Sequence, residues 1–121
     1  MAEFLPLVLG WLGSTAIVIL SFVPAELRPH VLKIGQLEHF WAYFVTSVAF
    51  ALAFKAGKRL ALVCIALSLL AALLEVAQLW IPGRHSQVID WAASSLGALV
   101  GVAPVLVLLW AATKIRRRPA R

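Results

Sequence analysis

The chain has 121 residues, of which 63% are hydrophobic and 13% are charged. A soluble domain of this size would need more polar residues to cover its surface, so the composition predicts a single integral membrane domain and excludes a separate soluble module. The net charge of +6 does not indicate nucleic-acid binding, because five of the cations form a tail after the last apolar segment. These cations are Lys114, Arg116, Arg117, Arg118 and Arg121.

Apolar segments of helix length follow one another along the chain. Each is close to the roughly 20 residues that a helix needs to cross a bilayer. We therefore predict an all-α, four-helix membrane bundle with spans over residues 4–23, 38–55, 59–81 and 86–113. Glu3 rather than a cation precedes the first segment, which is also long for the apolar part of a signal peptide, so we expect a retained helix.

The distribution of Lys and Arg predicts how the bundle is oriented. With four spans, both termini and the turn near residue 57 share one side of the membrane. Lys55, Lys58 and Arg59 together with the five tail cations place 8 of the 11 Lys and Arg residues on that side. The positive-inside rule therefore predicts that both termini are cytoplasmic.

Glu75 lies inside the third apolar segment, where a carboxylate costs roughly 2.5–3.5 kcal/mol on insertion scales. An acid at this depth is a candidate functional group, because it must face a partner rather than lipid. Gln78 follows it on the same helix face. His39 opens the second segment with Tyr43 one turn below, and Asp90 lies near the start of the fourth.

These polar residues fall at the same depth, because successive helices alternate in direction. We predict an outer-leaflet binding site that contains Glu75, Gln78, Arg84, Asp90, His39, Tyr43 and Ser94. A purely structural role is the alternative for each of these residues. Arg84 and Asp90, for example, would then form an ion pair that locks the turn. Gly97 and Gly101 form a small-xxx-small motif that predicts close helix packing and could also join copies in an oligomer.

The sequence contains no nucleophile elbow, HExxH motif, phosphate-binding glycine loop or Cys–His pair. We therefore expect no cofactor and assign no metal site, and we read Cys64 as a small apolar residue. Glu75, His39 and Asp90 remain candidate catalytic groups, as a general acid or base or as ligands of a divalent metal. They lie on separate helices, so their spacing in the sequence cannot show whether they meet.

An ordered set of short motifs resembles the VanZ-like family of small bacterial membrane proteins. The set covers nearly the whole chain: Leu20-Ser21-Phe22 with Pro24, His39-Phe40, Tyr43-Phe44, Glu75-x-x-Gln78, Pro82-Gly83-Arg84, Asp90, Gly97 and Gly101. Three positions depart from the family pattern. Gly35 and Gln36 stand where the family usually has Asp-Lys, and Ser94 stands where it usually has Asn.

The resemblance implies a multi-pass protein of the bacterial cytoplasmic (inner) membrane. The family's founding member is associated with resistance to teicoplanin, a lipid-tailed glycopeptide antibiotic. The expected partners are therefore membrane lipid and an amphiphilic envelope ligand, either a lipoglycopeptide or a cell-wall lipid, and the expected role is glycopeptide resistance or envelope maintenance. Two alternatives remain: a membrane enzyme that modifies a lipid head group with Glu75, His39 and Asp90, and a structural subunit of a membrane complex.

Overall fold

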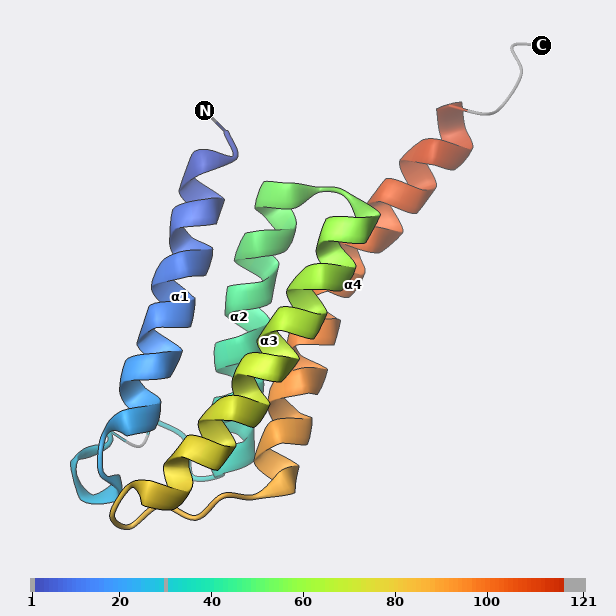
Figure 1. The fold of residues 1–121 in the computed structure, drawn as a ribbon. Coiled ribbons are helices and arrows are strands. Elements are labelled where there is room, and N and C mark those ends of the chain that lie inside the picture. Colours follow the sequence, from blue (N-terminus) through green and yellow to red (C-terminus); the bar gives the residue numbers. More distant parts are fainter. Residues whose placement is uncertain (1, 30, 117–121) are drawn as a thin grey trace.

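The computed structural model describes residues 2–29 and 31–116, and this part of the chain folds into long α-helices joined by short loops, with no strand (Figure 1). In chain order the elements are α1 (Phe4–Phe22), the 3₁₀ turn η1 (Ala25–Leu27), α2 (Gly35–Phe54), α3 (Gly57–Ala77), the 3₁₀ turn η2 (Gln78–Trp80) and α4 (Val88–Arg116). Four helices within the described ranges are long and apolar enough to cross a membrane, the third being α3 continued through η2. The predicted all-α fold is confirmed.

The helix ends differ from the predicted spans by a few residues. α1 ends one residue early, since Val23 is extended ahead of Pro24. α2 begins three residues earlier than predicted, at Gly35. α4 begins two residues later and runs three residues longer, to Arg116. Within the basic tail, Arg117, Arg118 and Arg121 lie outside the described residues.

The helices run up and down, so the two ends of the bundle carry different segments. The start of α1, the turn between α2 and α3 and the end of α4 lie at one end (Figure 1). The opposite end, which we call the site end, holds residues 23–29, 31–34 and 81–87 (Figure 1). This arrangement is the one that the count of Lys and Arg assumed, and the orientation in the membrane stays a prediction.

α2 is the central helix, since it packs against α4 most extensively and also against α1 and α3. The seam between α2 and α4 is very close. A Cβ on Gly97 would overlap the carbonyl oxygen of Phe40, and a Cβ on Gly101 would lie 2.6 Å from the carbonyl oxygen of Phe44. The small-xxx-small motif is therefore occupied inside the chain, and an oligomer would need another surface.

α4 is the longest element described. Its 29 residues extend about 43 Å, and its end projects past the turn between α2 and α3 (Figure 1). It tolerates Pro104 in its interior, as membrane helices often do. Near its end the ammonium of Lys114 lies 4.1 Å from the ring centre of Trp110, a cation–π contact typical of a membrane surface.

Candidate functional site

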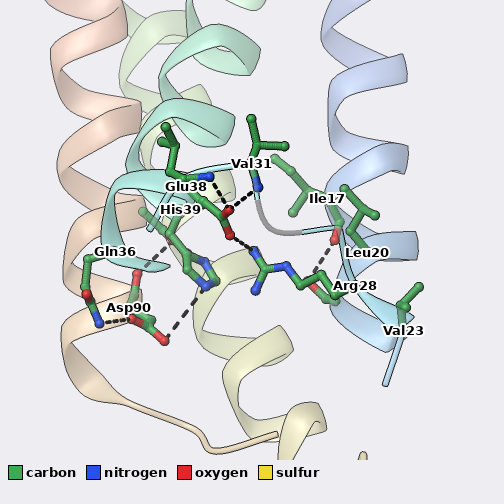
Figure 2. Close-up of polar contacts among 12 residues, drawn as sticks. Ile17, Leu20, Val23, Arg28, Val31, Gln36, Glu38, His39 and Asp90 are labelled. Atoms are coloured by element: carbon green, nitrogen blue, oxygen red, sulfur yellow. Dashed lines mark hydrogen bonds and ion pairs between the residues drawn. The ribbon is translucent and has the colours of Figure 1, made fainter. Parts of the chain in front are cut away.

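Three ionisable side chains from three different helices meet at the site end. Glu75 comes from the last turn of α3 and is only 7% exposed. His39 comes from the start of α2 and Asp90 from the first turn of α4. One nitrogen or oxygen of each lies within 4.8 Å of the others, and His39 Nε2 is 3.8 Å from Asp90 Oδ2 (Figure 2). We call these three residues the His–Glu–Asp cluster.

Neighbouring groups hold each member of the cluster in place. The backbone N–H of Gln87, just before α4, donates to Glu75 Oε2 at 3.0 Å. The Gln36 amide donates to Asp90 Oδ1 at 3.0 Å (Figure 2). Ser94 Oγ lies 3.5 Å from His39 Nδ1 and donates to the backbone oxygen of Asp90 at 2.9 Å. The predicted site residue Ser94 therefore lies behind the imidazole, at the α2–α4 seam.

Arg84 follows Gly83, whose φ of +73° forms the tight turn after η2. Its guanidinium donates to the carbonyl oxygens of Val23 at 3.1 Å and Leu20 at 2.6 Å. The last carbonyls of a helix have no partner within the helix and favour a cation, so Arg84 closes the end of α1. The predicted ion pair between Arg84 and Asp90, offered as one structural alternative, is not formed.

The environment of Arg84 contains charges of both signs. Burial lowers the pKa of its guanidinium, as does the nearby charge of Arg28, while Glu75 and Asp90 raise it. Arginine still keeps its proton at neutral pH in proteins. Arg84 therefore carries a full positive charge at the site end, balanced by helix-end carbonyls rather than by a bonded carboxylate.

An ion pair between Arg28 and Glu38 was not anticipated from the sequence. Arg28 Nη2 lies 3.0 Å from Glu38 Oε2 (Figure 2). Glu38 Oε1 accepts the backbone N–H groups of Val31 and Leu32 at 2.8 and 2.9 Å. The pair ties the loop before α2 to the helix. Its only signal in the sequence is that Glu38 adjoins His39 and that a cation precedes it by ten residues.

A small polar pocket of about 50 Å³ lies beside the cluster. The predicted site residues His39, Tyr43, Gln78 and Arg84 line it, together with the Arg28–Glu38 pair and, on the helices, Ile17, Leu20, Ser21 and Ala42. The Gln78 amide makes a long hydrogen bond of 3.5 Å to the backbone oxygen of Ser21, so it also bridges two helices. Glu75 and Asp90 do not line this pocket, which meets the cluster at His39.

A larger apolar groove of about 370 Å³ lies between α1 and α3, with α2 as its floor. Its lining residues are Trp11, Ser14, Phe50, Phe54, Arg59, Leu62, Val63, Ala66, Leu67 and Leu70. The groove and the pocket follow one another along α1, because Ser14 lines the groove and Ile17, about one turn farther on, lines the pocket. Sequence reasoning missed the groove, since its side chains are the same types that face lipid elsewhere.

The fold and the site together define a multi-pass helical membrane protein with a largely buried ionisable cluster at one end. Searches of protein-family models, of curated proteins and of solved structures found no match to this chain. The resemblance to the VanZ-like family therefore stays a prediction from short motifs.

Proposed function

We propose that this chain is a protein of the bacterial cytoplasmic membrane that binds an amphiphilic molecule of the cell envelope. The observation that carries this proposal is the succession of two cavities along α1, a polar pocket at the site end and an apolar groove beside it. An amphiphile likewise has a polar head joined to an apolar tail. Its head would enter the polar pocket and its tail would lie between α1 and α3.

The groove suits an alkyl tail by size and lining. Its volume of about 370 Å³ falls within the range of about 300–1,000 Å³ that is usual for small-molecule sites. Lipid tails are as apolar as the groove, so tail binding gains no free energy from leaving water. The groove therefore selects a tail by shape, and selection among amphiphiles must come from the head.

The polar pocket favours an anionic head. Two guanidinium groups, those of Arg28 and Arg84, line it against one carboxylate, that of Glu38. Guanidinium groups bind phosphate and carboxylate oxygens strongly because their fixed N–H donors match that geometry. A volume of about 50 Å³ admits only a small group, so the rest of a large head would lie outside the pocket.

The predicted orientation places this pocket where envelope molecules are found. With both termini cytoplasmic, the site end faces the outer leaflet. The VanZ-like resemblance narrows the ligand to a lipid-tailed glycopeptide of the teicoplanin type or a cell-wall lipid. Glycopeptide resistance or envelope maintenance would be the physiological outcome of binding.

The test is direct binding to the full chain in lipid nanodiscs, with teicoplanin and a polyprenyl-diphosphate cell-wall precursor as separate probes. We expect saturable binding of at least one probe. Ala66→Phe, which fills the groove, should weaken it at least tenfold. Ala61→Phe is the matched control, because Ala61 is an exposed alanine of the same helix that does not line the groove.

The head group is tested in the same assay. Arg28→Gln should weaken binding, whereas Lys33→Gln, which removes an exposed cation from the same loop, should not. A glycopeptide without a lipid tail should bind far less than teicoplanin. Equal binding by Ala66→Phe and Ala61→Phe, or no saturable binding of either probe to the unmodified chain, would overturn the proposal.

One observation favours a membrane enzyme as a second candidate. The catalytic candidates Glu75, His39 and Asp90 come together, and His39 also lines the polar pocket. A proton could therefore be exchanged with a bound head group through the imidazole. Conversion of the head group, followed by mass spectrometry and abolished by His39→Gln, would favour the enzyme over the binding protein. The structural-subunit alternative would need a surface other than the glycine motif, because α2 packs against that motif.

A further inference from the structure

We propose that His39, Glu75 and Asp90 form a binding site for one divalent transition-metal ion of the Zn²⁺ type. Their potential ligand atoms all lie within 4.8 Å of one another, and His39 Nε2 lies 3.8 Å from Asp90 Oδ2. Ligand atoms around a tetrahedral zinc ion, at bonds of 2.0–2.1 Å, are separated by about 3.3–3.5 Å. Small side-chain rotations would therefore bring the three groups onto one ion.

The hydrogen bonds of Ser94 orient the imidazole. Its single hydroxyl proton goes to the backbone oxygen of Asp90, so toward His39 Nδ1 the hydroxyl can only accept. Nδ1 then carries a hydrogen, and Nε2 faces the Asp90 carboxylate. Nε2 and Asp90 Oδ2 lie 3.8 Å apart, so an ion bound by both would draw them only slightly closer. The separation is also too long for a direct hydrogen bond.

Each potential ligand is oriented by a contact on another atom. His39 has Ser94 on Nδ1, Asp90 has Gln36 on Oδ1, and Glu75 has the Gln87 N–H on Oε2. Each residue keeps one further nitrogen or oxygen without a hydrogen bond to the described residues. Metal-binding imidazoles and carboxylates in proteins are held in this manner. These contacts come from outside the cluster, on the loop before α4, the start of α2 and the body of α4.

The charges of the cluster also favour a bound cation. Glu75 and Asp90 bring two negative charges close together, and Glu75 is only 7% exposed. Two negative charges this close together in a largely buried place repel each other. The bonded partners of the nearest guanidinium groups are Glu38 for Arg28 and the carbonyls at the end of α1 for Arg84. A divalent ion bound by both carboxylates would offset this repulsion.

The types of ligand atom restrict which metal ion would bind. One imidazole with two carboxylates suits Zn²⁺ and its transition-metal neighbours, whereas Ca²⁺ and Mg²⁺ prefer oxygen ligands alone. Three protein ligands would leave a fourth position of the ion open. Because His39 also lines the polar pocket, a head group is the natural occupant of that position. The metal site itself needs no bound amphiphile.

The test uses the full chain without an affinity tag, stripped with a chelator, in nanodiscs, with ZnCl₂ alone as the probe. We expect one zinc per chain by elemental analysis and a rise in thermal stability with added zinc. His39→Gln, Glu75→Gln and Asp90→Asn should each weaken zinc binding at least tenfold. His85→Gln and Glu26→Gln remove exposed groups in nearby loops and should leave it unchanged.

Two further measurements keep the proposal testable if a cluster variant fails to fold. Ser94→Ala and Gln36→Ala change only the orienting contacts and should weaken zinc binding about tenfold. Co²⁺ in place of zinc should give visible absorption bands of a four-coordinate nitrogen and oxygen site. Absence of saturable zinc binding, or equal losses in the cluster and control variants, would overturn the proposal. Amphiphile binding is measured separately in chelator, so failure of either proposal is recognised independently.

Discussion

Gly97 on α4 lies against the backbone carbonyl of Phe40 on α2, and no side chain would fit between them. This contact fixes how far α4 is shifted along its axis relative to α2. Phe40 adjoins His39, and Gly97 lies seven residues, about two turns, after Asp90. The closest approach of the two backbones therefore determines which residues of α4 stand opposite the imidazole.

Replacement of Gly97 should separate α2 from α4. We expect Gly97→Val to lower the free energy of unfolding by about 1–3 kcal/mol, because a backbone carbonyl cannot move aside as a flexible side chain can. The measurement is thermal unfolding in one detergent. Gly57→Ala is the control, since a Cβ at Gly57 meets nothing within 4 Å. Equal stability of the two variants would contradict the close seam.

Arg84 should be a structural anchor for the end of α1. Arg84→Ala removes two charge-assisted hydrogen bonds to the Val23 and Leu20 carbonyls, and each such bond contributes about 1.5–3 kcal/mol. Arg84→Lys keeps the charge but not the paired donors, so we expect an intermediate loss of stability. Limited proteolysis between α1 and α2 is the readout, with Lys33→Ala as control. Unchanged cleavage of Arg84→Ala would show that the anchor is dispensable.

The Arg28–Glu38 pair should show an interaction energy. A double-mutant cycle with Arg28→Gln and Glu38→Gln isolates the pair, since the amide oxygen introduced at position 38 can still accept the Val31 and Leu32 N–H groups. We expect a coupling of about 1–2 kcal/mol, because both side chains are mostly buried. Additive effects within roughly 0.3 kcal/mol would mean that the pair contributes nothing.

Labelling of introduced cysteines would test the predicted orientation. Cys64 is the only native cysteine, so Cys64→Ala provides a clean background. In intact cells a membrane-impermeant maleimide should react with Lys33→Cys and His85→Cys at the site end. It should react with Lys58→Cys, in the turn between α2 and α3, only after permeabilisation. The reverse pattern would place the site end in the cytoplasm and remove the basis for an outer-leaflet ligand.

The fold was largely predictable, because a span is a property of local composition. Twenty apolar residues in a row suffice to predict a membrane helix, whatever its neighbours are. The helix ends were less exact, since they depend on local hydrogen bonds. α4 begins late because the carbonyl of Gln87 accepts the first N–H groups, those of Asp90 and Trp91. The preference of α2 for α4 over α3 depends on surface shape, which the sequence pattern does not give.

The site was predictable in one respect only. Spacing along each helix gives the depth of a residue, and that sufficed to place Glu75, His39 and Asp90 at one level. The ion pair between Arg84 and Asp90 was one alternative left open, and Arg84 instead donates to backbone carbonyls at the end of α1. Residue types along the sequence do not reveal such acceptors. The Arg28–Glu38 pair depends on the fold of a loop, and loop paths are not encoded by periodicity.

The length of α4 makes its position in the membrane depend on the thickness of the bilayer. A bilayer's hydrocarbon layer is about 30 Å thick, so a helix of about 43 Å must lean or lift its final turns into the head groups. The other spans of the described chain are shorter, with at most 24 residues, so they exceed this thickness less or not at all. Asp90 and Ser94 lie near the other end of α4. A thinner or thicker bilayer would therefore move Asp90 relative to His39 and Glu75, even when no ligand is bound.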